Sequence, residues 1–265
     1  MYLKLYGLKQ SPFNITSDPN FFFESASHKE ALATLLYGIE EKKGIILVSG
    51  EVGTGKTTLC RTLLKRLSED IKTSLILNPY FSEVQLLQAI VEDFGINVKK
   101  RNRLDIVKSL NSFLLDVSLL GGGAALIIDE AQNLSSRQLE QVRLLSNLET
   151  SEQKLLQIVL LGQPEIDKKL EKFNLRQIRQ RIAVKCKLLP LRREEIKPYI
   201  EHRLNKSKSI GIQIPPESYD LIYEFSKGIP RLINILCDRA LLFGFIKEKK
   251  ALCPSIFRVC IEELK

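Results

Sequence analysis

Histidine and closely spaced cysteines are scarce in this chain. Its sequence contains only two histidines, His28 and His202, and five cysteines that never form a C-x-x-C pair. A structural zinc site needs a set of such ligands at short spacing, so the composition argues against one. The cysteines are odd in number and lie far apart among apolar neighbours. This pattern indicates buried free thiols in a reducing compartment rather than a disulfide framework.

Long hydrophobic runs are also missing. The longest nearly apolar stretch, residues 117–128, contains one serine and three glycines and is too short to span a bilayer. The N-terminus, Met1 to Lys4, lacks a charged segment followed by an apolar one, so no signal peptide is expected. The absences together predict a soluble cytoplasmic chain with no membrane span.

The composition that remains is ordinary for a globular protein, but it is basic. Of 265 residues, 44% are hydrophobic and 27% charged, and the formal net charge is +9 at pH 7. This balance favours an acidic partner such as nucleic acid, anionic lipid or an acidic protein surface. The basic clusters at residues 99–103 and 247–250 are more readily explained as solvated loops than as a nucleic-acid patch.

One glycine-rich motif dominates the sequence. Residues 50–57 read Gly-Glu-Val-Gly-Thr-Gly-Lys-Thr and fit G-x-x-x-x-G-K-[ST] at every fixed position. An apolar stretch, Ile45 to Val48, leads into the motif, and a helical pattern, Thr57 to Leu67, follows it. Strand, glycine loop and helix form the arrangement of a phosphate cradle. Glycines let backbone N–H groups turn inward, and the helix presents its positive end to the phosphates.

The motif assigns a role to each loop residue. Lys56 is predicted to reach the β- and γ-phosphates, and Thr57 to ligand Mg²⁺. The rest of the loop is predicted to surround the nucleotide: Gly50, Glu51, Val52, Gly53, Thr54, Gly55 and Thr58. The alternative is a glycine-rich turn that contains Lys-Thr by chance, which the flanking strand and helix disfavour.

Two acids follow a second buried strand. Residues Ala124 to Ile128 form an apolar run that ends abruptly in Asp129 and Glu130. Ligands of open α/β sheets lie beyond the carboxyl ends of the strands, so both acids are expected at the site. Asp129 is predicted to hold Mg²⁺, and Glu130 to orient and polarise the attacking water. The alternative is an ordinary helix-capping acid pair.

Phosphoryl transfer also needs neutralisation of the charge on the γ-phosphate, which directs attention to further polar residues. Gln163 follows the strand from Leu156 to Leu161 and is predicted to contact the γ-phosphate or the water. Its alternative role is a turn residue before Pro164. Candidates for an arginine acting in trans precede the last strand, although each taken singly is more readily a surface charge: Arg176, Arg179 and Arg181.

Strands alternate with helices up to residue 188, which predicts a parallel α/β sheet with helices on both faces. Beyond Leu189 and Pro190 only helical patterns occur, so we predict two domains: residues 1–190, with an N-terminal arm whose phenylalanines pack onto the core, and an all-helical domain of residues 191–265. Arg231 opens one of these helices, where a cation opposes the helix dipole unless a phosphate compensates it. The alternative is a plain helix start after Pro230.

Taken together, these motifs resemble those of the AAA+ ATPases. That superfamily has a phosphate loop, an Asp-Glu pair, a polar sensor (here Gln163), an arginine finger near the last strand, and a second sensor arginine (here Arg231) that opens a lid helix. Within it, the chain is similar to the ATPase module of the ExeA type, general secretion pathway protein A. Transposition ATPases of the TniB/TnsC kind share much of the pattern. The segments that carry the resemblance are residues 1–13, 50–58, 129–134 and 161–165.

The resemblance implies a P-loop AAA+ core with a small helical lid, which binds ATP and Mg²⁺ and hydrolyses ATP. It also implies a ring or helical homo-oligomer, because the finger arginine comes from a neighbouring subunit. The expected task is assembly or localisation of a secretion or export complex, through a partner at the inner face of the cell membrane. One alternative is a DNA-binding transposition regulator, which the +9 charge suggests. Another is an ATP-gated switch with negligible turnover.

Overall fold

The computed structural model of this chain describes residues 2–98, 102–209 and 211–264. Contacts divide the chain into two compact units. The first, here called the sheet unit, comprises Lys29–Glu51 and Leu59–Leu188. The second, here called the helical unit, comprises Met1–His28, Val52–Thr58 and Leu189–Lys265.

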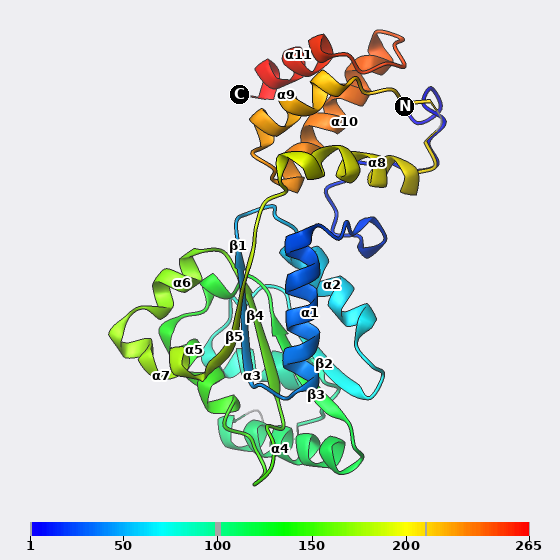
Figure 1. Ribbon diagram of the computed structural model, residues 1–265. Coiled ribbons are helices and arrows are strands. Elements are labelled where there is room, and N and C mark those ends of the chain that lie inside the picture. Colours follow the sequence, from blue (N-terminus) through cyan, green and yellow to red (C-terminus); the bar gives the residue numbers. More distant parts are fainter. Residues whose placement is uncertain (1, 99–101, 210, 265) are drawn as a thin grey trace. The chain divides into compact units, whose positions relative to one another are not determined.

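The sheet unit is built on five parallel strands in the order β2-β3-β4-β1-β5 (Figure 1). Every residue of β1 and β4 is buried, as is typical of parallel strands covered on both faces. The prediction of a parallel α/β sheet is therefore confirmed. The strands are β1 (Ile45–Gly50), β2 (Ile71–Ile76), β3 (Gly123–Ile128), β4 (Gln157–Gly162) and β5 (Ile182–Leu188).

Helices cover both faces of this sheet. On one face, Ile45, Leu126 and Ile158 belong to a buried cluster that includes residues of α3, α4 and α5. Alternate strand residues point to the other face. There, α1 approaches so closely that a Cβ added to Gly38 would lie 2.5 Å from Cδ1 of Ile46. The helices are α1 (Ala26–Glu40), α2 (Lys56–Arg66), α3 (Glu83–Asp93), α4 (Arg103–Leu119) and α5 (Ser136–Leu145).

Two further helices of the sheet unit, α6 (Glu165–Leu170) and α7 (Arg176–Arg181), were not predicted from the sequence. Each is six residues long, which is too short to show helical periodicity. Helix α6 follows β4 after Gln163 and Pro164, and α7 leads directly into β5. The Arg-rich segment before the last strand is therefore a helix. Short 3-10 turns at Pro19–Phe21, Ala131–Asn133, Phe173–Leu175 and Arg193–Glu195 complete the chain.

The helical unit contains the four helices expected after residue 190: α8 (Ile196–Lys206), α9 (Pro216–Ser226), α10 (Pro230–Ile246) and α11 (Pro254–Leu264) (Figure 1). The N-terminal arm packs with them. Tyr6 and Phe13 share a buried cluster with Phe257, and the Tyr6 hydroxyl donates to the carbonyl of Lys249 at 2.9 Å. The arm therefore groups with these helices, whereas the predicted division at residue 190 placed it with the sheet. That division stays a prediction.

Two predictions from the sequence concern membrane spans and the state of the cysteines. Within the described residues, no helix combines the length and apolar character that crossing a bilayer requires. All five cysteines are free, and only Cys253 is not buried. Burial raises the pKa of Cys60 to about 12, so this side chain stays a thiol at neutral pH.

Gly228→Ala should destabilise the protein far more than Gly211→Ala. Both glycines have φ in the left-handed region, +79° and +85°. A Cβ on Gly228 would lie 2.0 Å from the backbone carbonyl oxygen of Leu191, whereas a Cβ on Gly211 would meet nothing within 4 Å. We expect Gly211→Ala to cost about 1 kcal/mol in the free energy of unfolding, and Gly228→Ala about 1–3 kcal/mol more. Urea unfolding of both variants measures the difference, and equal losses would contradict the tight contact at Gly228.

Candidate nucleotide-binding site

The order of the strands brings the predicted polar residues of the sheet unit to one edge. Strand β4 lies between β1 and β3, with Gly162 paired to Ser49 and Leu160 paired to Ile128. Residues that follow these strands therefore emerge next to each other at the carboxyl edge, where α/β sheets bind ligands. Asp129 and Glu130 leave β3 there, and Gln163 leaves β4.

Asp129 is fixed by its backbone and almost fully buried. Its side chain belongs to a residue that is 2% exposed, and its N–H donates to the carbonyl of Ile76 at 2.8 Å. One carboxylate oxygen, Oδ1, accepts a hydrogen bond from the N–H of Glu130 at 2.9 Å. A buried carboxylate at the end of a strand is a rigid oxygen donor of the kind that Mg²⁺ prefers.

Glu130 adopts a left-handed backbone conformation, with φ 52° and ψ 38°. A residue other than glycine pays about 1–3 kcal/mol for such a conformation, and these residues concentrate at functional sites. Two amides hold its carboxylate oxygen Oε2: Nε2 of Gln163 donates at 3.2 Å, and Nε2 of Gln132 donates at 2.5 Å. The structure therefore brings the side chains of Glu130 and Gln163 into contact, while their predicted catalytic roles stay predictions.

Gln132 is the residue of this cluster that sequence reasoning missed. Besides donating to Glu130, its Oε1 accepts from the N–H of Gln163 at 2.9 Å, so one side chain joins the ends of two strands. The 3-10 turn at Ala131–Asn133 directs it back toward β4. Lys169 donates to the carbonyl of Gln132, and to that of Leu134 at 2.9 Å, which anchors the turn. The available signal was an amide two residues after a predicted catalytic acid.

The glycine loop contains two glycines with positive φ. Gly53 and Gly55 have φ of +80° and +102°, a conformation that L side chains rarely adopt. The loop ends where α2 begins at Lys56. Thr54 and Lys56 are 0% and 6% exposed, whereas Val52 is 51% exposed, so the second half of the loop is packed and its first half is open.

Arg231 contacts this loop within the helical unit. Its N–H donates to the carbonyl of Gly53 at 3.2 Å, and a Cβ on Gly53 would lie 2.7 Å from the Cβ of Arg231. Helix α10 begins at Pro230, one residue earlier, as expected for proline at the first helical position. The loop glycine and the predicted sensor arginine therefore touch, although they are distant in the sequence.

His28 also contacts the loop, and the sequence reasoning missed it. Its Nε2 lies 3.0 Å from the carbonyl oxygen of Thr54, and its Nδ1 lies 2.7 Å from Oγ of Ser25. The carbonyl only accepts hydrogen bonds, so Nε2 carries the proton and Nδ1 accepts from the serine hydroxyl. Burial lowers the pKa of His28, against the opposing effects of the Thr54 carbonyl and Glu195. A serine three residues before a histidine at a helix start was the available signal.

The predicted finger arginines lie together on the short helix α7. Arg176, Arg179 and Arg181 are exposed, and the guanidinium of Arg176 lies over the ring of Phe173 at 5.6 Å. A side chain that reaches a neighbouring subunit must be exposed, but ordinary surface charges are exposed as well. The trans role of these arginines stays a prediction.

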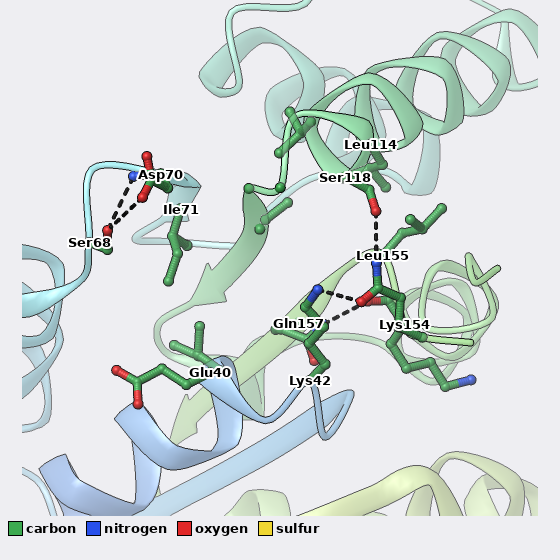
Figure 2. A pocket seen from close by; sticks show the side chains of 17 residues that line it. Glu40, Lys42, Ser68, Asp70, Ile71, Leu114, Ser118, Lys154, Leu155 and Gln157 are labelled. Atoms are coloured by element: carbon green, nitrogen blue, oxygen red, sulfur yellow. Dashed lines mark hydrogen bonds between the residues drawn. The ribbon is translucent and has the colours of Figure 1, made fainter. Parts of the chain in front are cut away.

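A separate cavity of about 220 Å³ lies at the amino ends of the strands, away from the predicted site (Figure 2). Several of its polar side chains bind each other or the backbone. Gln153 accepts from Lys42 at 2.5 Å and donates to Ser118 at 2.9 Å, and Gln157 donates to the carbonyl of Lys154 at 3.1 Å. These hydrogen bonds hold the strand starts together, and we assign the cavity a structural role.

Comparisons with known proteins assign the chain to a family. A family model described as an AAA domain matches residues 39–170. The chain is also 42% identical over 248 residues, 93% of its length, to General secretion pathway protein A of Aeromonas hydrophila. The chain belongs to the AAA+ ATPases. The chain spans 45% of the length of that relative.

Solved structures share the AAA+ fold. Cdc6p from Pyrobaculum aerophilum has a TM-score of 0.69 at 17% identity, covering 93% of this chain and 71% of that one. ORC2 from Aeropyrum pernix, in ADPNP-ADP complexes, has a TM-score of 0.68 at 16% identity, and the match covers 92% of this chain and 70% of that one. The RuvB Holliday junction branch migration motor of Thermotoga maritima has a TM-score of 0.62 at 18% identity, and the match covers 92% of this chain and 70% of that one. These similarities confirm the predicted fold class.

Acid should destabilise the protein partly through His28. Its pKa is lowered from 6.5 in the folded state, so the unfolded chain takes up the proton first as the pH falls. The stability from neutral His28 is therefore complete above 6.5 and is lost as the pH falls through the folded pKa. We expect the free energy of unfolding in urea to drop as the pH falls below about 6.5, and to drop less in His28→Gln.

His202 is the matched comparison for this measurement, because burial also lowers its pKa. His28→Gln and His202→Gln should each remove part of the pH dependence. A pH dependence in His28→Gln identical to that of the parent chain would show that His28 is not held neutral.

Proposed function

We propose that this chain binds ATP with Mg²⁺ and hydrolyses it, with Glu130 as the residue that polarises the attacking water. The observation that carries the proposal is the fixed carboxylate of Glu130, held by the amides of Gln132 and Gln163 at the edge of the sheet where β1 leads into the glycine loop. The membership of the AAA+ family supports nucleotide binding.

In this proposal the glycine loop, Gly50 to Thr58, surrounds the phosphates with its backbone N–H groups, and Lys56 contacts the β- and γ-phosphates. Thr57 and Asp129 would hold Mg²⁺. A hydroxyl and a buried carboxylate fit a cation that takes oxygen ligands and usually binds through one or two carboxylates plus phosphates. The bound ion would neutralise charge that develops on the phosphate oxygens.

Hydrolysis would depend on the polar cluster after β3 and β4. Glu130 accepts a proton from the attacking water as it polarises it, and Gln163 contacts the water or the γ-phosphate. Arg231 and one of Arg176, Arg179 and Arg181 would stabilise the phosphate charge, the latter from a neighbouring subunit. An arginine in trans is worth roughly 10³–10⁵ in rate, so the active form would be a ring or helical homo-oligomer.

The cellular task we propose is assembly or localisation of a secretion or export complex at the inner face of the cell membrane. It is supported by the 42% identity to General secretion pathway protein A, of which the chain spans 45%. The free cysteines agree with a cytoplasmic location. A partner protein of that machinery would supply the membrane contact.

Two alternatives make different predictions. The net charge of +9, and a structural neighbour named as a Holliday junction motor, favour a DNA-bound ATPase. Double-stranded DNA would then stimulate phosphate release, and log K would fall linearly with log salt. The other alternative, a switch with negligible turnover, predicts nucleotide binding without phosphate release whether or not DNA is present. Steady-state phosphate release at low salt, with and without DNA, separates all three.

Lys56→Ala should abolish nucleotide binding. The substitution removes the charge that contacts the β- and γ-phosphates, so we expect at least a 100-fold rise in the Kd for a fluorescent ATP analogue, about 2.7 kcal/mol. Lys65→Ala is the matched control, since it removes an exposed lysine from the last turn of the same helix and should leave the Kd unchanged. Retained affinity in Lys56→Ala would contradict the assignment of the phosphate loop.

Glu130→Gln should bind ATP but fail to hydrolyse it. The amide keeps the shape of the side chain but cannot take a proton from water, so we expect phosphate release to fall by about 10²–10⁴. Glu165→Gln, at the exposed start of α6, is the control and should hydrolyse ATP normally. Light scattering should show stabilised oligomers of Glu130→Gln with ATP. Unchanged turnover would mean that another residue positions the water.

A further inference from the structure

We propose that His28 is a positioning residue for the phosphate loop, through which the N-terminal arm sets the loop's affinity for nucleotide. The inference rests on the proposed binding of ATP by residues 50–58. It adds a residue outside every recognised motif, on a segment that the sequence motifs leave without a role.

The orientation of one peptide group carries the argument. Nε2 of His28 donates to the carbonyl of Thr54 at 3.0 Å. That carbonyl and the N–H of Gly55 belong to one planar trans peptide, so they point in opposite directions. Holding the carbonyl toward His28 therefore directs the Gly55 N–H away from the imidazole. A phosphate cradle needs its loop N–H groups to converge on the anion, and His28 prevents this peptide from turning over.

The imidazole also occupies the space beside the loop. A Cβ added to Gly55 would lie 3.0 Å from Nε2 of His28, and the φ of Gly55 is already +102°. The ring and the glycine are thus in direct contact, with no room for a larger residue without a shift. The left-handed turn at Gly55 and the position of His28 depend on each other.

Residues of the arm and of the helix start fix the ring itself. Oγ of Ser25 accepts from the backbone N–H of His28 at 3.3 Å and lies 2.7 Å from Nδ1, where its hydroxyl donates. This bond selects the tautomer that has its proton on Nε2, toward Thr54. The ring of Phe22 packs edge-on against the imidazole, with centroids 5.4 Å apart. The order of the arm is therefore transmitted to the loop.

One carboxylate acts on this cluster. Glu195 lies on the turn before α8, accepts from the N–H of Ala26 at 3.0 Å, and raises the pKa of His28, but less than burial lowers it. The imidazole thus stays neutral, with one donor and one acceptor. Protonation would add an N–H at Nδ1, so the Ser25 hydroxyl would have to rotate and accept from the ring instead of donating to it.

Two substitutions at His28 separate hydrogen bonding from packing. His28→Gln keeps an N–H donor at similar reach, whereas His28→Leu keeps an apolar side chain of similar bulk and loses the donor. We expect the Kd for a fluorescent ATP analogue to rise roughly ten-fold in His28→Leu, and less than about three-fold in His28→Gln. Ser25→Gly removes the hydroxyl that selects the tautomer, while glycine is tolerated at a helix start, and should raise the Kd several-fold.

The free energy of unfolding without nucleotide is measured for each variant, so that a loss of stability is not mistaken for a loss of affinity. Equal Kd values for His28→Gln and His28→Leu would overturn the proposal, because a purely structural role does not distinguish donor from bulk. If His28→Leu fails to fold, Ser25→Gly decides, and an unchanged Kd in that variant overturns the proposal.

Lys56→Ala, measured in parallel, separates this inference from the function on which it rests. If Lys56→Ala loses binding while the His28 and Ser25 variants match the parent chain, only the role of His28 fails. If Lys56→Ala binds like the parent chain, the phosphate-loop assignment fails, and the role of His28 fails with it.

Discussion

The backbone ladder between β1, β4 and β3 is the constraint on which the polar cluster depends. Because these buried strands are parallel, each N–H and C=O must pair with a neighbour, and the register places Gly162 beside Ser49 and Leu160 beside Ile128. That register alone sets where Asp129 and Gln163 leave the sheet. The side chain of Gln132 then links the ends of the two strands by a hydrogen bond, so the cluster is held as rigidly as the sheet itself.

Strain at Glu130 shows how the rest of the turn supports the cluster. Among the residues that the structure describes, the other left-handed residues that are not glycine are Lys42, Lys208, Lys227 and Glu248, which lie at turns or helix ends. Glu130 lies at the start of the 3-10 turn, separated by one residue from β3, of which every residue except Gly123 is buried, and the hydrogen bonds from Lys169 hold that turn. The strained backbone brings the Glu130 carboxylate to the amides of Gln132 and Gln163, and their hydrogen bonds offset part of the strain.

Prediction from sequence succeeded where the signal is local and failed where it is not. The strands and long helices follow from apolar runs, periodicity and glycine, all readable within a short window. Helices α6 and α7 are too short to show a repeating apolar pattern. Gln132 and His28 were missed because their partners lie 31 and 26 residues away, so only the folded chain shows what they contact. A glutamine or histidine near a helix start has many possible roles, and no spacing rule selects one.

The glycine loop belongs to a different compact unit from the strand that leads into it. Residues Val52–Thr58 group with the arm and the C-terminal helices, although β1 and most of α2 belong to the sheet unit. Within that group, consecutive loop carbonyls are bound by distant segments: Gly53 by the N–H of Arg231, and Thr54 by His28. A change in the loop backbone at Gly53 and Thr54 would alter both bonds. Under the proposed function, nucleotide that orders the loop would therefore also favour one arrangement of the arm and of the start of α10, because binding and these contacts share one free energy.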